Sequence, residues 1–223
     1  EKQRGISVTS SVLQFEYNDY CINILDTPGH QDFSEDTYRT LMAADSAVML
    51  IDGAKGVEAQ TIKLFHVCKM RGIPIFTFIN KMDILGANFY GCVEQIKNRL
   101  GKNAICLQLP IGKEDEFKGI IDLFEMKAYI YNDNKGDDIS IVDIPEDMAD
   151  DAELYRTELV EKICELDDDL MMMYLEGEEP SVEEMKAVLK KATCSCDAVP
   201  VCCGTSYRNK GVQKLLDAVV EYM

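Results

Sequence analysis

Short continuous runs of apolar residues recur along the chain, and the first three each end at a polar side chain. The runs cover residues 21–25, 47–51, 73–79 and 198–203, and the first three are followed by Asp26, Asp52 and Asn80. Strands that are buried on both faces of a parallel sheet have this continuous pattern, whereas strands with one solvated face alternate. The pattern therefore predicts strands of a parallel sheet at all four places.

Helical segments fill the intervals between these runs. We predict helices over residues 34–42, 58–71, 88–100 and 212–222. Strands that alternate with helices indicate a doubly wound α/β sheet, and ligands of such sheets bind at the carboxyl ends of the strands. The polar residues that follow the first three runs are therefore expected beside a ligand site.

A different pattern occupies residues 101–198. We predict strands over 104–109, 117–123 and 127–131, a polar turn over 133–137, and acidic amphipathic helices over 150–175 and 181–191. Ser181 and Glu184 have the spacing of a capping box at the start of the last helix. We therefore divide the chain into an α/β core, residues 1–100 and 199–223, and a small α+β insert, residues 101–198.

The charge supports this division. The chain has 23 Lys and Arg against 40 Asp and Glu, a net charge of −17. Residues 101–198 hold 10 basic and 26 acidic side chains, a net of −16, and the remainder holds 13 and 14, a net of −1. Direct binding to a nucleic-acid backbone needs clustered Lys and Arg, so this composition argues against it.

The cysteines indicate the compartment. The chain has 9 of them, an odd number, and most lie inside apolar runs, without the spacing of a zinc site. Reduced thiols of this kind are typical of a cytoplasmic protein. No apolar run approaches the roughly 20 residues that a membrane helix needs, so we expect no membrane association.

The first chemical motif is Asp26-Thr27-Pro28-Gly29-His30, directly after a predicted strand. A carboxylate at a strand end suits Mg²⁺, often through water, and a nearby glycine lets a backbone N–H approach an anion. The histidine can orient a water or move a proton. Taken alone, the same stretch is also an ordinary turn.

The second motif is Asn80-Lys81-Met82-Asp83, after another predicted strand. The Asp83 carboxylate can accept the two N–H donors of guanine, at N1 and at the 2-amino group, and adenine offers no such pair. The aliphatic part of Lys81 can lie on a ring face. Alone, this stretch is equally a capped loop before a helix, and the presence of both motifs at strand ends favours the functional interpretation.

Two weaker signals lie elsewhere. Ser7, in the segment Arg4-Gly5-Ile6-Ser7-Val8, offers a hydroxyl to a metal. Gly204-Thr205-Ser206-Tyr207 is a loop of mostly small residues after the last strand, and its N–H groups can contact a base carbonyl.

Together these segments resemble the motifs of the translational GTPases. Asp26–His30 resembles their D-x-x-G element, Asn80–Asp83 their N-K-x-D element, Gly204–Tyr207 their G-S-A loop, and residues 1–8 the end of switch I. From residue 100 onward the chain is similar to the elongation factor G family, through 109–112, 122–123, 126–128, 174–179 and 209–213. The first part, through residues 4–8 and 34–41, is more similar to peptide chain release factor three.

The resemblance implies a role for each matching residue. Ser7 would ligate Mg²⁺ directly and Asp26 through water, Gly29 would contact the γ-phosphate of GTP, and His30 would position the attacking water. Thr27 and Pro28 complete that nucleotide-binding segment. Binding of the base in GTP or GDP falls to Asn80, Lys81, Asp83, Thr205, Ser206 and Tyr207.

The resemblance also implies partners and alternatives. We expect a monomeric GTPase that acts at the GTPase centre and protein stalk of the large ribosomal subunit and drives translocation. A release-factor-three-like recycling factor, a tetracycline-resistance-type ribosomal protection protein and a G-domain-like module that never hydrolyses GTP share the same motifs. The acidic insert is expected to meet a basic partner at the stalk, or else to serve solubility.

One element of the family is missing from the sequence. The phosphate-binding P-loop, G-x-x-x-x-G-K-[ST], has no match in these residues, and in the family it precedes switch I. We therefore expect a fold like that of the P-loop GTPases but truncated at its N-terminus, in a fragment that by itself binds GTP poorly.

Overall fold

The structure is a computed structural model that describes residues 10–27, 34–101 and 103–223. Its centre is a four-stranded parallel sheet in the order β3-β4-β10-β5. These strands are β3 (Ala47–Asp52), β4 (Ile75–Asn80), β10 (Val199–Cys203) and β5 (Ala104–Cys106). Continuous apolar runs thus do form parallel strands at residues 47–51, 73–79 and 198–203, and the α/β fold class is confirmed.

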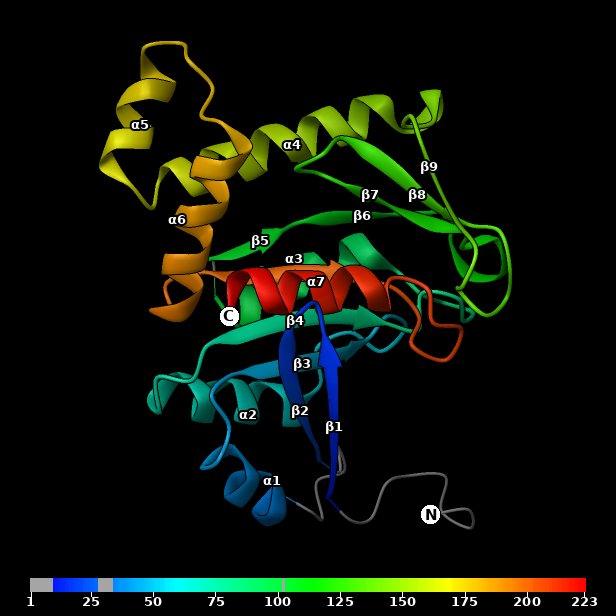
Figure 1. Cartoon of the computed structure of the whole chain (residues 1–223), viewed down its shortest axis with the longest axis vertical. Coiled ribbons are helices and arrows are strands. Elements are labelled where there is room, and N and C mark those ends of the chain that lie inside the picture. The colour runs from blue at the N-terminus through cyan, green and yellow to red at the C-terminus, as the bar shows by residue number, and fades with distance from the viewer. Residues whose placement is uncertain (1–9, 28–33, 102) are drawn as a thin grey trace.

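Helices connect and cover this sheet. They are α1 (Ser34–Leu41), α2 (Ala59–Met70), α3 (Phe89–Arg99) and α7 (Val212–Tyr222), each within two residues of its predicted bounds. Figure 1 shows α7 in front of the sheet and α2 at the side of β3. None of the helices in the described ranges is long and apolar enough to cross a bilayer.

The insert forms a second layer with its own sheet. Its strands β6 (Gln108–Ile111), β7 (Gly119–Asp122), β8 (Lys127–Tyr131) and β9 (Ile139–Val142) pair antiparallel in sequence order. Its helices are α4 (Ala149–Cys164), α5 (Asp168–Leu175) and α6 (Val182–Cys194), with single 3-10 turns at Glu114–Glu116 and Glu146–Met148. In Figure 1 this layer occupies the upper half of the molecule.

Two predicted elements of the insert are divided in the structure. The strand expected over 104–109 breaks at Leu107, because β5 joins the parallel sheet while β6 starts the second sheet. The Leu107 N–H donates to the Val201 carbonyl at 2.9 Å, and the Leu107 carbonyl accepts from the Leu123 N–H at 3.0 Å, so this residue joins the two sheets. The helix expected over 150–175 was wrong as one element, because Asp167 accepts from the amides of Asp169 and Leu170 and starts a new helix.

The prediction that residues 21–25 form a strand of the parallel sheet was also wrong. The strand exists as β2 (Tyr20–Asp26), but it pairs antiparallel with β1 (Ser11–Tyr17), a strand that the sequence analysis missed. Asn18 and Asp19 connect the two strands with φ values of 48° and 65°. Two consecutive positive φ angles are typical of a type I′ hairpin turn, which Asn and Asp tolerate. The Tyr17 hydroxyl donates to Asp217 at 2.6 Å and thereby ties the hairpin to α7.

One apolar core runs through both layers. Its most deeply buried large side chains come from the parallel sheet, from the second sheet and from α3 and α4; they include Ile51, Phe76, Phe78, Ile79, Ile96, Ile105, Leu109, Ile120, Ile121, Leu123 and Leu159. Burial of this kind stabilises each layer by contact with the other, since removing apolar surface from water contributes about 25 cal/mol per Å². The insert therefore holds the core sheet from one side.

Candidate functional site

Three parallel strands bring their carboxyl ends to one edge of the sheet. Asp52 and Asn80 are directly paired in register, and Cys203 lies beside Ile79. The loops that follow are joined by backbone hydrogen bonds, from Gly53 N–H to the Asn80 carbonyl at 2.8 Å and from Met82 N–H to the Gly204 carbonyl at 3.1 Å. The two loops that carry the second motif and the small-residue motif are therefore held against each other.

Asn80 is the side chain that locks these loops together. Its amide nitrogen donates to the Ser206 hydroxyl oxygen at 2.9 Å, and its amide oxygen accepts from the Ser206 N–H at 2.9 Å and from the Lys81 N–H at 2.8 Å. Residues 126 positions apart in the chain thus share a closed hydrogen-bonded ring. The ring therefore fixes the loop after β4 against the turn after β10.

Lys81, directly after β4, forms an ion pair with Asp52 at the end of the neighbouring strand β3. The Lys81 ammonium lies 2.8 Å from an Asp52 oxygen, and Asp52 also accepts from the N–H groups of Ala54 and Lys55 at 3.0 and 3.2 Å. Burial alone would raise the pKa of Asp52, but these hydrogen bonds and the positive charge of Lys81 hold it below its ordinary value. Lys81 has a φ of 62°, an uncommon backbone angle for a residue with a side chain and one that recurs at binding sites.

Asp83 pairs with a residue that the sequence analysis did not single out. Its carboxylate forms an ion pair with Arg208, whose Nε lies 2.9 Å from Oδ2. The Asp83 side chain is 11% exposed and that of Arg208 is 39% exposed. A pairing between residues so far apart in sequence has no local signal, so only the fold reveals it.

Arg208 lies in a tight turn that follows β10. Thr205 and Lys210 exchange two backbone hydrogen bonds, of 2.8 and 3.1 Å, and close the turn. Gly204 is required at its base, because a Cβ there would lie 2.3 Å from the Lys210 carbonyl oxygen. Tyr207 at the tip is 96% exposed, and the Thr205 hydroxyl is buried without a hydrogen-bond partner in the described part of the chain.

The predicted site residues thus fall into two groups. Those that the structure brings together are Asn80, Lys81, Asp83, Thr205, Ser206 and Tyr207, and Asp52 joins them. Asp26 is exposed at the end of β2 and Thr27 follows it; in Figure 1 this end of the hairpin lies at the bottom, away from the turn after β10 on the right. The other predicted positions, Ser7, Pro28, Gly29 and His30, lie outside the described residues.

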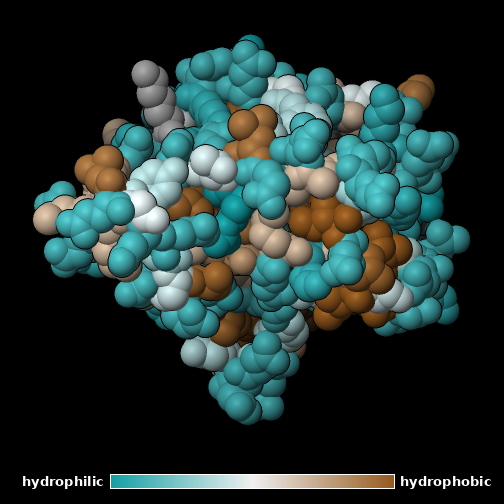
Figure 2. All heavy atoms as spheres, turned by 90° about the horizontal axis from the view of Figure 1, so that it is seen from above, coloured by the Kyte–Doolittle hydropathy of each residue, from teal (hydrophilic) through white to brown (hydrophobic). Residues whose placement is uncertain are grey.

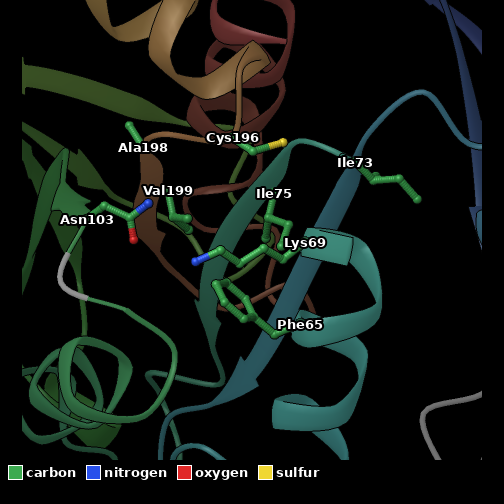
Figure 3. A pocket seen from close by; sticks show the side chains of 8 residues that line it. All are labelled: Phe65, Lys69, Ile73, Ile75, Asn103, Cys196, Ala198 and Val199. Carbon is green, nitrogen blue, oxygen red and sulfur yellow. The ribbon is translucent and has the colours of Figure 1, made fainter. Parts of the chain in front are cut away.

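Two cavities elsewhere do not include these residues. The smaller, shown in Figure 3, has a volume of about 10 Å³, room for no more than one water, and lies at the amino ends of β4 and β10, where Ile75 and Val199 contribute to its wall. The larger, of about 220 Å³, lies between the insert and α7. Its two ammonium groups are already paired, Lys214 with Asp122 at 3.2 Å and Lys186 with Glu221 at 2.9 Å.

Comparison with known proteins gives two findings. The sequence model of a family described as the elongation factor Tu GTP binding domain matches residues 1–223. A crystal structure of a protein from Thermus thermophilus matches 100% of this chain with a TM-score of 0.91 and 27% sequence identity. This chain spans only 33% of the length of that protein.

Proposed function

The chain belongs to the elongation factor Tu GTP-binding domain family, and we propose that it is the guanine-nucleotide domain of a translational GTPase similar to elongation factor G. The observation that carries the proposal is the cluster of Asn80, Asp83 and Ser206 at the carboxyl ends of β4 and β10. Family membership supports the nucleotide class, and the cluster supports the position of the base.

Each group of the cluster has a donor or acceptor that suits guanine. Asp83 accepts from N1–H and the 2-amino group, and the Tyr207 N–H donates to the base carbonyl, because the Thr205 and Ser206 amides already donate to the Lys210 carbonyl and to Asn80. The Asn80 ring keeps the two loops at a fixed separation. Lys81, whose side chain is 52% exposed, covers one face of the base with its aliphatic part.

The phosphate side of the site rests on the resemblance of Ser7 and of residues 26–30. The Ser7 hydroxyl and the Asp26 carboxylate would hold Mg²⁺, since they are the oxygen ligands that this ion prefers, and the bound ion would supply positive charge to the phosphates. The exposure of Asp26 at the end of β2 fits a ligand that acts through a water. By the same resemblance, the Gly29 N–H would donate to the γ-phosphate, and His30 would orient the water that attacks it.

The free edge of β3 supports a further proposal about the phosphates. Val48 and Leu50 on one face of β3 are 41% and 59% exposed, whereas Met49 and Ile51 on the other face are 9% and 1% exposed. Within the described ranges β3 pairs only with β4, and a parallel strand is normally covered on both faces. We propose that a strand and a helix that carry the phosphate-binding loop cover this edge in the full gene product.

Exchange of the base-reading carboxylate tests the function. In the full gene product Asp83→Asn should shift the preference from GDP to xanthosine diphosphate, whose 2-position carries a carbonyl that the new amide can donate to. Two hydrogen bonds to a charged group are at stake, so the ratio of the two dissociation constants should change roughly 100-fold to 10,000-fold. Competition titrations with both nucleotides measure it.

Asp52→Asn is the matched control, because Asp52 is a carboxylate on the same sheet edge that pairs with Lys81. It should leave the preference for guanine over xanthine unchanged. Unaltered base preference in Asp83→Asn would contradict the assigned role of Asp83.

We propose that hydrolysis on the ribosome drives translocation. The likeness of residues 109–112 and 209–213 to the elongation factor G family supports this step over factor recycling. A translocation assay with the full gene product separates the two, since a recycling factor would hydrolyse GTP on the ribosome without advancing transfer RNA.

The acidic insert is proposed to face the protein stalk of the large subunit. Figure 2 looks from above, where α4 and the other insert elements lie, and mostly hydrophilic side chains cover this face. A net charge of −16 would repel ribosomal RNA and attract a basic protein surface. The affinity of the insert for the stalk should fall as salt rises, and an affinity that salt leaves unchanged would contradict the charge argument.

A further inference from the structure

We propose that Arg208 is a gate on the base-reading carboxylate: its guanidinium lies against Asp83 and must leave before a base can bind. The inference rests on the proposed function, because it concerns the same site. It adds a residue that sets nucleotide affinity and assigns it a direction, namely that Arg208 weakens binding.

The first support is the accessibility of Asp83. Its side chain is only 11% exposed, and the Arg208 Nε lies 2.9 Å from Oδ2. A base that reads this residue needs both carboxylate oxygens, one for N1–H and one for the 2-amino group. The guanidinium beside Oδ2 therefore competes with the base for this oxygen.

The second support is chemical likeness. Guanidinium N–H groups and the N1–H and 2-amino donors of guanine are planar nitrogen donors that suit the same carboxylate. Arg208 thus pairs with Asp83 at the place where the ligand would bind. The exchange of one for the other leaves the carboxylate paired in both states, which avoids the cost of an unpaired buried charge.

The third support is the turn that carries Arg208. The Thr205–Lys210 hydrogen bonds and the Asn80–Ser206 ring hold the backbone on both sides of the tip. The Arg208 side chain is 39% exposed, so solvent is available to receive its guanidinium. Opening the gate is therefore a rotation of one side chain, while the rest of the base site stays in place.

A consequence for affinity follows. The free energy of the Asp83–Arg208 pair is subtracted from that of nucleotide binding, because the two interactions exclude each other. A partly exposed ion pair changes an equilibrium by about 1.4- to fivefold. Arg208→Ala should tighten GDP binding by this factor, and Arg208→Gln should do the same since it also removes the charge.

The test measures GDP dissociation constants by calorimetry on the full gene product. Lys113→Gln is the matched control: Lys113 is exposed, makes no ion pair in the described ranges, and precedes Glu114, whose N–H donates to the Met82 carbonyl at 3.1 Å. It removes a positive charge near the same loop without touching Asp83. Its GDP affinity should stay within about twofold or fall, since a cation near a polyphosphate helps binding.

A double-mutant cycle separates the gate from a general effect of the turn. In the Asp83→Asn background Arg208→Ala should leave the affinity for xanthosine diphosphate unchanged, because the ion pair is already gone. A gain of the same size in both backgrounds, or a loss of GDP affinity on Arg208→Ala, would overturn the gate.

The outcomes also distinguish failure of the gate from failure of the proposed function. If the unsubstituted protein binds GDP and Asp83→Asn switches to xanthine, while Arg208→Ala and Arg208→Gln change nothing, the function stands and the gate fails. If the unsubstituted protein binds no guanine nucleotide, both are overturned.

Discussion

The two sides of the sheet edge differ in how completely they are built. On the β4–β10 side, the loops are interlocked by the Asn80–Ser206 ring, the Thr205–Lys210 pair and the Asp83–Arg208 ion pair. On the β3 side, the strand has a free edge within the described ranges, and Leu50 is 59% exposed on one face. Polar contacts join the loops after β4 and β10, whereas β3 leaves apolar surface in water.

This difference teaches which part of nucleotide recognition these residues supply by themselves. Polar groups that pair with one another define a fixed geometry, so the proposed base side is the better built of the two. Most contacts to a nucleoside triphosphate are made by its phosphates and their metal. We therefore expect the 223-residue chain alone to bind guanine nucleotides weakly, with the base side as its main contribution.

The largest expected effect concerns the catalytic residue assigned by resemblance. His30→Ala in the full gene product should slow ribosome-stimulated GTP hydrolysis roughly 100-fold to 10,000-fold, because general acid–base and water-positioning groups contribute that much. Nucleotide affinity should stay within about twofold, since the base side is untouched. Single-turnover hydrolysis and GDP titration measure the two quantities separately.

The control for this substitution is His66→Ala. The chain has 2 histidines, and His66 is exposed on α2. Its removal should change neither hydrolysis nor affinity. Normal turnover in His30→Ala would show that another residue positions the attacking water.

The next effect sharpens the contrast between the two sides through stability. Phe78 is 1% exposed on β4, and Phe78→Ala should lower the free energy of unfolding of this chain by about 3–5 kcal/mol. Leu50→Ala, on the free face of β3, should lower it by no more than about 0.5 kcal/mol. Urea unfolding of the two variants gives both values, and equal losses would show that the face of β3 is already covered.

The same pair of variants extends to the full gene product. If a further strand and helix cover β3 there, Leu50→Ala should cost about 2 kcal/mol or more, as for a buried leucine. A cost that stays near zero would contradict the proposed cover of β3.

The success of sequence reasoning also differs between regions, for physical reasons. The runs that end at Asp52 and Asn80 are continuous apolar segments of strand length, so their pattern alone placed β3 and β4. The hairpin was missed because its strands are half exposed and its signal is the Asn18–Asp19 turn, which depends on two positive φ angles. The division of residues 104–109 at Leu107 depends on which sheet each half joins, and that is a tertiary property.

The site shows the same limit. The placement of Asp83 beside the turn after β10 could be predicted from strand order at one sheet edge. The pairing of Asp83 with Arg208 and of Lys81 with Asp52 could not, because each depends on side-chain reach between loops far apart in sequence. The residues of such a site can therefore be predicted from sequence more readily than the side chains with which they form ion pairs.

The smallest expected effect concerns the joint between the core and the insert, which supports the sheet from the opposite side to the free edge. Glu158 on α4 accepts from Lys97 of α3 and from Lys162 at 3.1 Å, and the Lys162 ammonium also donates to the Ala104 carbonyl at 2.8 Å. Burial alone would raise the pKa of Glu158, but the hydrogen bonds and charges of the two lysines hold it below the ordinary value. The joint is therefore an acid-sensitive contact.

The sign of its pH dependence follows from this direction. Because the pKa of Glu158 is lower in the folded than in the unfolded state, the stabilisation is complete above the ordinary pKa near 4.5 and is lost as pH falls through the folded-state value. Glu158→Gln should lower the free energy of unfolding by roughly 0.5–1 kcal/mol at pH 7, since the group is 37% exposed and solvent screens it. The difference from the unsubstituted chain should shrink as pH is lowered below about 4.5.

Glu153→Gln is the control. Glu153 is an exposed carboxylate on the same helix with no ion pair in the described ranges, so its substitution removes the same charge and should cost nothing at either pH. Urea unfolding of both variants at several pH values decides the matter, because a constant difference between Glu158→Gln and the unsubstituted chain would mean that this joint is held by packing rather than by its charges.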